Sequence, residues 1–526
     1  MEPRLIGPQS AVWALVLLVI LVTLASLRPL LPIDETRYLD VAWEMRLSGD
    51  VFHLTRNFEL YTQKPPLLFW LINLVWQFAG VSEFAARLVA PAFGVASAIA
   101  MAGLARRLWP EDEGVGARSI LVLTGFTVFL IYASLTLFDT MLTFATILGV
   151  GLLWRIGQGE RGRWLWIAFG LVLALGVYAK GPVIFVHLMP VLLTMPFWAP
   201  SPPRLVEAGK GFGIALGAGL FLVAVWLVPA LIGGTAAYRE ELLWTQSAAR
   251  VAGGLAHDRP VWFLASLLPV LLFPWAWSWR LWPAVVRAVR GDAGGRMLAI
   301  WAGSGLVLFS LISGKQIHYL IPEFPAVAML MARALGSVER TGRGGSAAAA
   351  IPVVIGLAAL ALALGLISTT GDLEPLKPGW VVALFGLVCI ALGVFGWRLT
   401  FTRAHAVFGI GIAAALHILI ETTGFHTADD HHEISAKLAA AENGGLAVAE
   451  MIYNAEFNFG ARLTTPVAVL SGPDALRSWS AAYPEGLLFG PVDRVPLTSE
   501  PESETFYNGT RYGFWSAATV AASIRG

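Results

Sequence analysis

Residues 33–66 read IDETRYLDVAWEMRLSGDVFHLTRNFELYTQKPP and lie between two strongly apolar parts of the chain. The apolar run Ala11–Leu31 ends just before them, and the segment that begins at Leu67 is again apolar. Ionisable side chains are therefore concentrated where the chain would meet the edge of a membrane. Such a cluster is either a solvated helix end or part of a functional site. The other polar segments of the chain help to distinguish these two interpretations.

The composition indicates an integral membrane protein. Of the 526 residues, 57% are hydrophobic and 13% are charged, whereas soluble domains carry about 25% charged residues. The formal net charge is +1, so no bulk positive field favours nucleic acid. A single cysteine, Cys389, lies in an apolar run, and one cysteine can form neither an internal disulfide nor a thiolate metal cluster.

Apolar runs predict about thirteen transmembrane helices, because about 20 apolar residues cross a bilayer core of roughly 30 Å. The first run has no small-residue cleavage site before Asp34, so we expect a retained span rather than a signal peptide. The expected spans lie near 11–31, 84–105, 117–134, 138–154, 164–180, 182–199, 211–233, 262–280, 297–313, 316–335, 347–368, 379–397 and 404–421.

Basic residues set the expected orientation, because loops rich in arginine and lysine stay in the cytoplasm. Alternate loops are basic, and the connections between them hold the unusual polar clusters. We therefore expect these clusters on the non-cytoplasmic side of the membrane. The basic loops hold Arg106, Arg107, Arg118, Arg155, Arg161, Arg163, Arg204, Lys210, Arg280, Arg287, Arg290, Arg296, Arg333, Arg340, Arg343, Arg398 and Arg403.

Two domains are expected. Residues 1–423 would form the transmembrane domain, and its first periplasmic loop, 32–83, contains an amphipathic segment at Val41–Leu47 that suits a helix lying in the interface. Residues 424–526 contain short strand-like runs and many turn residues, and about 100 residues suffice for a small α/β domain. The start of this domain is rich in histidine and acid, which fits metal binding or a charged helix start: His426, Asp429, Asp430, His431, His432 and Glu433.

Three carboxylates are candidates for chemistry. Asp34 and Glu35 follow the first span directly, and Asp139 lies where two spans meet. An ionisable group close to hydrocarbon is costly, so it indicates a functional site. A solvated helix end remains the alternative for the first two.

Cationic and phenolic side chains fall on the same expected face. Lys64 precedes Pro65 and Pro66, which fix the backbone locally, and Lys180 occupies a tight turn. Snorkelling to the interface is the alternative for both lysines. The remaining candidates on this face are Tyr38, Tyr61, Arg250, His257, Lys315 and Tyr319.

Together these groups suit a lipid-linked phosphate. Cations and phenols hold a phosphate through charge-assisted hydrogen bonds. A carboxylate can activate an acceptor or stabilise an oxocarbenium-like sugar. Nucleotide sugars are not expected outside the cytoplasm, and the Walker, Rossmann, GxSxG and HExxH motifs do not occur in the sequence. A sugar carried on a lipid phosphate is therefore the expected donor.

Six motifs in order resemble the ArnT-type membrane glycosyltransferases, which are GT-C enzymes related to the protein O-mannosyltransferases. The resemblance covers roughly residues 30–330. The motifs are Asp34-Glu35-Thr36-Arg37-Tyr38, Tyr61…Lys64-Pro65-Pro66, Leu137-Phe138-Asp139, Ala179-Lys180-Gly181-Pro182, Arg250…Gly253-Gly254…His257…Arg259-Pro260 and Lys315…Tyr319-Leu320…Pro322.

The resemblance implies an α-helical GT-C fold of about thirteen transmembrane helices with a small C-terminal periplasmic α/β domain. It implies an inverting transfer of a sugar, aminoarabinose in ArnT, from undecaprenyl phosphate to lipid A or another envelope acceptor. Asp34 would be the main catalytic carboxylate and Asp139 a second acid. The donor phosphate site would comprise Lys64, Arg250, Tyr319, Tyr61 and Tyr38, with Glu35, Lys180, Lys315 and His257 as a second tier.

Two positions depart from the ArnT pattern. Gln63 and Thr245 stand where ArnT has a glutamate and a histidine that bind a metal, so we assign no cofactor and keep a divalent metal as the alternative. The sugar and the acceptor stay open for the same reason. Alternatives are a protein O-mannosyltransferase-like enzyme, or a transporter or flippase of lipid-linked glycans that would need no essential aspartate.

Overall fold

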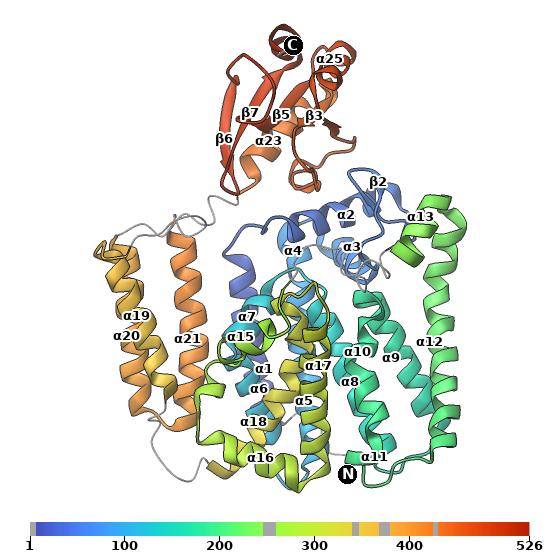
Figure 1. The fold of residues 1–526 in the computed structure, drawn as a ribbon, viewed down its shortest axis with the longest axis vertical. Helices are drawn as coiled ribbons and strands as arrows, with labels where there is room; N and C mark the ends of the chain where they lie inside the picture. Colours follow the sequence, from blue (N-terminus) through green and yellow to red (C-terminus); the bar gives the residue numbers. More distant parts are fainter. Residues whose placement is uncertain (1–6, 246–258, 339–346, 368–378, 424–429, 525–526) are drawn as a thin grey trace.

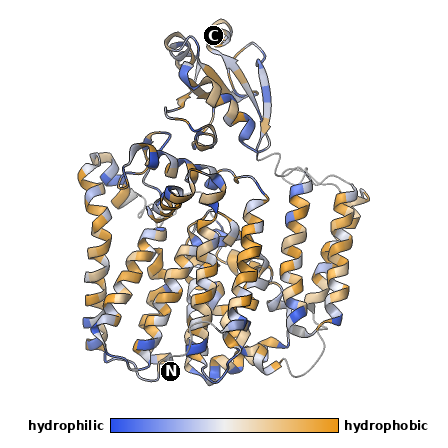
Figure 2. Ribbon diagram, turned by 180° about the vertical axis from the view of Figure 1, so that it is seen from behind, coloured by the Kyte–Doolittle hydropathy of each residue, from blue (hydrophilic) through white to orange (hydrophobic). Residues whose placement is uncertain are grey.

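The computed structural model describes residues 7–245, 259–338, 347–367, 379–423 and 430–524. A bundle of long helices carries a small domain with a β-sheet at one end (Figure 1). The chain runs through the bundle from α1 to α21 and then enters the C-terminal domain. Figure 2 shows that the long helices are mainly apolar along the middle of the bundle.

Nine helices in the described residues are long and apolar enough to cross a membrane. A tenth would be the pair α6 and α7, which is bent by 78° at Phe126. These helical segments are Pro8–Ser26, Glu83–Leu108, Asp139–Gly157, Arg163–Leu193, Leu205–Gly233, Ala293–Leu311, Ile317–Val338, Trp380–Arg398 and Thr402–Thr422, with Val115–Gly125 and Thr127–Ser134 as the bent pair.

Fewer long helices appear than the apolar runs predict, because some runs are broken. The expected span over 262–280 contains α15 (Phe263–Leu271), which is followed by a turn at Pro274 and the short η3 (Trp275–Trp277). A proline removes a backbone donor and interrupts the helix. Two further apolar helices are short, α3 (Leu67–Ala79) and α19 (Ala350–Ala363). The count of thirteen therefore stays a prediction.

The other elements of the bundle have the following bounds: α1 (Pro8–Ser26), α4 (Glu83–Arg87), α5 (Val89–Leu108), α6 (Val115–Gly125), α7 (Thr127–Ser134), α8 (Asp139–Gly157), α9 (Arg163–Lys180), η1 (Gly181–Val183), α10 (Ile184–Leu193), α11 (Met195–Trp198), α12 (Leu205–Gly233), α13 (Ala236–Glu240), η2 (Glu241–Thr245), α16 (Leu281–Gly291), α17 (Ala293–Leu311), η4 (Ile317–Glu323), α18 (Phe324–Val338), η5 (Ala347–Ala349), α20 (Trp380–Arg398) and α21 (Phe401–Thr422).

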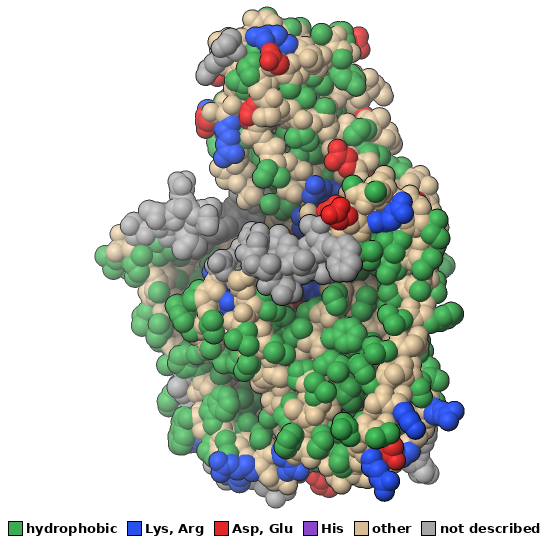
Figure 3. Space-filling view, turned by 45° about the vertical axis from the view of Figure 1, so that its right-hand side comes forward, with side chains coloured by type: hydrophobic (Ala, Val, Ile, Leu, Met, Phe, Trp, Pro, Cys, Tyr) green, Lys and Arg blue, Asp and Glu red, His purple; other side chains and the backbone are tan. Residues whose placement is uncertain are grey.

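The surface of the bundle identifies the chain as a multi-pass membrane protein. On α12, Leu220, Phe221 and Ile232 expose 66%, 76% and 78% of their surface. Apolar surface of this extent is unfavourable in water and favourable against lipid chains. Figure 3 shows a hydrophobic band around the middle and clusters of Lys and Arg at the end away from the C-terminal domain.

A polar loop between α1 and α5 covers the opposite end of the bundle. It contains α2 (Asp34–Ser48), the two-stranded β1 (Thr55–Arg56) and β2 (Glu59–Leu60), and then α3 and α4. Two acids in the first turn of α2 suit the positive end of the helix dipole, and Gly49, at φ +69°, ends the helix. Helix α2 lies between the bundle and the C-terminal domain (Figure 1).

The C-terminal domain is a small α/β domain, as the sequence predicts. Its sheet has the strand order β4-β3-β5-β7-β6, with β3 parallel to β4 and β5, and β7 antiparallel to β5 and β6. All four residues of β3 are buried, which is typical of a parallel strand covered on both faces. The elements are α23 (His432–Ala441), η7 (Glu442–Gly444), β3 (Leu446–Ala449), α24 (Asn458–Ala461), β4 (Ala468–Leu470), α25 (Pro473–Ala482), β5 (Leu487–Pro491), β6 (Ser503–Tyr507), β7 (Thr510–Ser516) and α26 (Ala517–Ser523).

Specific contacts fix this domain on the polar loop. Asn57 donates its amide to the carbonyl of Val467 at 2.9 Å and accepts from the Val467 backbone N–H at 2.9 Å. The indole of Trp43 donates to the carbonyl of Leu463 at 2.8 Å. The rings of Trp76 and Phe459 stack with centroids 5.5 Å apart. The C-terminal domain thus packs on the loop that carries Asp34.

Candidate active site

Asp34 is the first residue of α2, and one of its carboxylate oxygens is fixed by neighbouring side chains. Its Oδ1 accepts a hydrogen bond of 2.9 Å from the hydroxyl of Tyr38 and forms an ion pair with Arg37, residues one turn further along the helix. The Asp34 side chain keeps 50% of its surface exposed. Burial and the neighbouring Asp34 charge raise the pKa of Tyr38 well above its ordinary value, so the phenol stays a donor. The result is an oriented and accessible carboxylate.

Lys64 lies against the ring of Tyr38, the same tyrosine whose hydroxyl donates to Asp34. Its ammonium nitrogen is 5.7 Å from the ring centre of Tyr38 and 5.6 Å from that of Phe138. The two rings meet edge to face with centroids 4.9 Å apart. Aromatic faces attract a cation at such distances. Lys64 is therefore positioned between the helix that begins at Asp34 and the turn that leads to Asp139.

Tyr61 precedes Lys64 in the same loop and is buried. Its side chain is 3% exposed, its backbone N–H donates to the carbonyl of Leu54 at 2.7 Å, and the guanidinium of Arg56 lies 5.7 Å from its ring centre. Its phenol also interacts electrostatically with Arg37 and Tyr38. Tyr61 thus belongs to the same polar group as Asp34.

Asp139 is the first residue of α8 and is 2% exposed. Its carboxylate pairs with the ammonium of Lys180 at 2.6 Å, and that ammonium lies 5.0 Å from the ring centre of Tyr319. Lys180 ends α9, where Gly181 takes φ +77° and allows the chain to turn. Three of the expected site residues therefore meet at one point.

His318 joins the two halves of the site. Asp34, Lys64, Asp139 and Lys180 all act electrostatically on its imidazole. Sequence reasoning did not select this histidine, although it stands between the chosen Lys315 and Tyr319. The sequence feature that could have identified His318 is its position in the short polar turn between two apolar runs.

The ring of His318 lies among aromatic side chains. Its ring centre is 5.7 Å from that of Tyr132 and 5.0 Å from that of Tyr319. The imidazole therefore extends the aromatic wall from Tyr319 towards α7.

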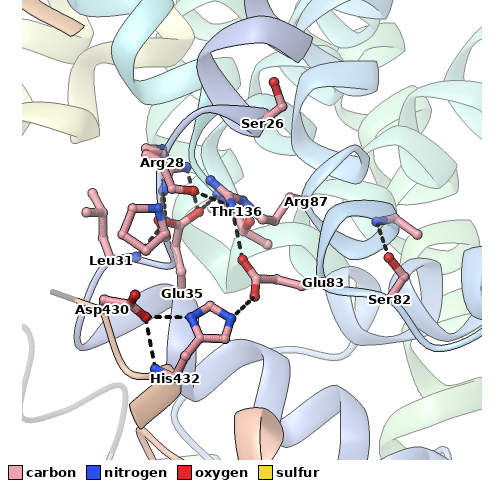
Figure 4. A network of polar contacts seen from close by, with 12 residues as sticks. Ser26, Arg28, Leu31, Glu35, Ser82, Glu83, Arg87, Thr136, Asp430 and His432 are labelled. Atoms are coloured by element: carbon pink, nitrogen blue, oxygen red, sulfur yellow. Dashed lines mark hydrogen bonds and ion pairs between the residues drawn. The ribbon is translucent and has the colours of Figure 1, made fainter. Parts of the chain in front are cut away.

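Glu35 faces away from Asp34, into the protein. It is 1% exposed, and its carboxylate accepts hydrogen bonds from both terminal nitrogens of Arg28. It also accepts hydrogen bonds from the backbone N–H groups of Leu31 at 3.0 Å and Thr136 at 2.6 Å (Figure 4). Burial would raise the pKa of Glu35, but the Arg28 charge and its hydrogen bonds outweigh burial and lower the pKa to about 2. Glu35 thereby ties the start of α2 to the turn before Asp139.

Lys315 is also engaged with the protein backbone. It is 2% exposed, and its ammonium donates to the carbonyl of Arg259 at 2.6 Å and to that of Ser313 at 3.5 Å. This geometry holds the loop after α17. Arg250, His257 and the side chain of Thr245 lie outside the described residues, and Gln63 is exposed.

Comparisons with known proteins identify the family. Residues 12–203 match the family of dolichyl-phosphate-mannose-protein mannosyltransferases. Over 404 residues the chain is 30% identical to an undecaprenyl phosphate-α-4-amino-4-deoxy-L-arabinose arabinosyl transferase of Pseudomonas fluorescens, covering 74% of this chain and 70% of that relative. The chain belongs to the ArnT family of GT-C glycosyltransferases.

Further ArnT proteins support this placement. The enzyme of the same name from Pseudomonas aeruginosa is 30% identical over 373 residues, so the match spans 69% of this chain but only 65% of that relative, slightly less than two thirds. The crystal structure of ArnT from Cupriavidus metallidurans bound to undecaprenyl phosphate has a TM-score of 0.74 at 17% identity and covers 96% of this chain and 97% of its own. The expected ArnT-like GT-C fold is confirmed.

Proposed function

We propose that this ArnT-family chain is an inverting glycosyltransferase that moves a sugar from undecaprenyl phosphate to a lipid A-type acceptor. The observation that carries the proposal is that Tyr38 links the half-exposed Asp34, to which its hydroxyl donates, with Lys64, whose ammonium lies near its ring. The relatives' names and the undecaprenyl phosphate in the ArnT crystal structure support this donor. A flippase would have no need of an oriented carboxylate.

The donor phosphate would bind at Lys64. An ammonium held over two rings can turn towards an anion without leaving its aromatic wall. Tyr38 and Tyr61 would line this site, and Arg250 and Tyr319 would complete it. Asp139 would keep Lys180 in place at its edge, because a largely buried lysine needs its counter-ion.

Transfer would proceed in one displacement. The acceptor oxygen attacks the anomeric carbon from the face opposite the phosphate, the new C–O bond forms as the bond to the phosphate oxygen breaks, and undecaprenyl phosphate leaves with the electron pair. Lys64 stabilises the negative charge that develops on this leaving group. Asp34 stabilises the positive charge on the sugar.

The acceptor decides the second role of Asp34. A lipid A phosphate is already anionic and needs no base, so Asp34 would orient and stabilise it. A hydroxyl acceptor, as in the mannosyltransferase family that the chain also matches, would pass its proton to Asp34. We favour the lipid A-type acceptor because the arabinosyl transferases match over a longer part of the chain.

The site would lie on the periplasmic side of the inner membrane. Exposed basic residues, including Arg161, Arg204, Lys210 and Arg287, stand at loops that the positive-inside rule places in the cytoplasm. Helix α2, which begins at Asp34, and the C-terminal domain lie at the other end of the bundle (Figure 1).

We further propose that the reaction uses no metal at the position of Gln63 and Thr245. An amide and a hydroxyl are poor ligands for a transition metal compared with imidazole and carboxylate.

Reconstituted protein tests the function. Purified protein in vesicles would receive an undecaprenyl phosphate-linked sugar together with lipid A or, separately, a serine-rich peptide, and mass spectrometry would identify the product. We expect glycosylated lipid A with the anomeric configuration inverted relative to the donor. Glycosylated peptide alone would favour the mannosyltransferase-like alternative, and movement of intact donor across the bilayer without transfer would favour a flippase.

A further inference from the structure

Two histidines and a glutamate meet where the C-terminal domain approaches α4. Glu83 is the first residue of α4, and His431 and His432 stand at the start of α23. One potential ligand atom from each of the three lies within 4.8 Å of the others. The cluster therefore joins two parts of the chain that are far apart in sequence.

His432 is oriented like a metal-binding histidine. Its Nδ1 lies 2.5 Å from Oδ1 of Asp430, and its Nε2 faces Oε2 of Glu83 at 3.8 Å (Figure 4). A carboxylate on one ring nitrogen fixes the tautomer and leaves the lone pair of the other nitrogen free to bind a metal. The 3.8 Å separation is too long for a hydrogen bond but fits two ligands of one ion, since zinc bonds to nitrogen and oxygen are each about 2.0–2.2 Å.

His431 supplies an independent indication of a ligand. It is 1% exposed, and neither of its ring nitrogens has a hydrogen-bond partner among the described residues. Its ring centre is 4.5 Å from that of His432. Buried polar nitrogens are nearly always satisfied, so an unsatisfied pair of them next to a second histidine indicates a missing partner.

The surroundings leave space for the His431 ring. A Cβ at Gly460 of α24 would lie 2.9 Å from Nε2 of His431, so only glycine fits there without displacement. Arg87 donates to Oε1 of Glu83 at 3.0 Å and orients that carboxylate, leaving Oε2 towards His432. His432, Arg87 and Arg462 act electrostatically on His431, and the carboxylate of Asp430 opposes their effect.

We propose that Glu83, His431 and His432 bind a divalent transition-metal ion of the zinc class, with Asp430 orienting His432. Two imidazole nitrogens and one carboxylate oxygen favour zinc over calcium or magnesium, which prefer oxygen ligands. A water molecule completes four-fold coordination. This ion clamps the C-terminal domain to α4 and is separate from the position of Gln63 and Thr245.

Metal content of the full-length protein tests the site. The protein is purified through a peptide tag that binds no metal, stripped with a chelator, dialysed against zinc, and measured by inductively coupled plasma mass spectrometry. We expect about one zinc per chain in the wild type. His431→Ala and His432→Ala should each lose the stoichiometric zinc, and Asp430→Asn should weaken binding about 10- to 100-fold.

Glu433→Gln is the matched control, because Glu433 neighbours the cluster but pairs with Lys437 and Thr505. It should bind zinc like the wild type. X-ray absorption of the zinc-loaded protein should show two histidine nitrogens. Hydrogen exchange in α23 and α4 should slow when zinc is added to the wild type but not to His432→Ala, provided that both fold equally by circular dichroism. A wild-type protein without stoichiometric zinc would overturn the proposal, and so would zinc binding by the combined His431→Ala and His432→Ala variant that equals that of the wild type.

Discussion

The hydroxyl of Tyr38 donates a hydrogen bond of 2.9 Å to Oδ1 of Asp34, and the ring of the same tyrosine lies 5.7 Å from the ammonium of Lys64. One side chain thus contacts both the proposed catalytic carboxylate and the proposed phosphate-binding cation. Tyr38→Phe would separate these two contacts, because it removes the hydroxyl and keeps the ring. We expect kcat to fall about 10- to 150-fold, since hydrogen bonds to charged groups contribute roughly 1.5–3 kcal/mol, while the donor KM stays within about 2-fold. Steady-state kinetics with a soluble donor analogue would measure both, and an unchanged kcat would remove Tyr38 from the mechanism.

Lys64→Ala should weaken binding of the donor. Loss of one charge-assisted contact to phosphate should reduce affinity for undecaprenyl phosphate about 10- to 100-fold, and Lys64→Arg should restore part of it. Binding can be measured by photolabelling with a polyprenyl phosphate analogue. Lys437→Ala, on the C-terminal domain, is the control and should label like the wild type. Equal labelling of Lys64→Ala would exclude this lysine from the phosphate site.

The pair Asp139–Lys180 should contribute to stability as well as to activity. With side chains 3% and 14% exposed, removing one partner leaves a nearly buried charge. Asp139→Asn should therefore destabilise the protein by about 3 kcal/mol, whereas the double change Asp139→Leu with Lys180→Leu should recover most of this loss. Chemical unfolding in detergent would report both values. A double variant as unstable as the sum of two independent losses would show that the pairing itself is not responsible.

Glu35 predicts a loss of stability in acid. Its pKa is lowered from 4.5 to about 2 in the folded protein, so its stabilising contribution is present above pH 4.5 and is lost as the pH falls towards 2. Glu35→Gln should be less stable than the wild type at pH 7, and the difference should shrink below pH 4.5. Unfolding measured at a series of pH values would test this, and a constant difference between the two proteins would contradict the assignment.

For Asp40 and Glu44 we expect stability to depend on pH in the opposite direction. Burial and mutual repulsion raise the pKa of Asp40 well above its ordinary value, and burial raises that of Glu44. Their contribution is fully present below their ordinary pKa values and is lost as the pH rises through the raised ones. Asp40→Asn should therefore become more stable than the wild type at high pH. Melting temperatures of the two proteins over a series of rising pH values would show the variant gaining on the wild type, and a difference that does not change with pH would count against it.

Local sequence patterns predict the membrane bundle, the polar loop and the C-terminal sheet because each depends on the character of consecutive residues. The bend between α6 and α7 was not predictable in this way. Trp275 donates to the carbonyl of Val122 at 3.0 Å, and a Cβ at Gly409 would lie 1.7 Å from the carbonyl oxygen of Gly125. These are contacts between segments far apart in the chain. A continuous apolar run carries no signal of them.

The site shows the same limit. The sequence places Asp34, Lys64, Asp139 and Lys180 on one face, but only the structure shows that Asp139 pairs with Lys180, 41 residues away. Glu35 looks equivalent to Asp34 in sequence. Adjacent helical positions point in different directions, however, and Glu35 forms a buried ion pair with Arg28.

The most direct test of the proposed mechanism is single-turnover transfer by Asp34→Asn, with donor binding measured on the same preparation. Asparagine keeps the size of the side chain and removes its charge. We expect binding of undecaprenyl phosphate within about 2-fold of the wild type and a transfer rate lower by about 10²- to 10⁴-fold. Transfer at the wild-type rate with normal binding would contradict the assignment of Asp34 as the catalytic carboxylate.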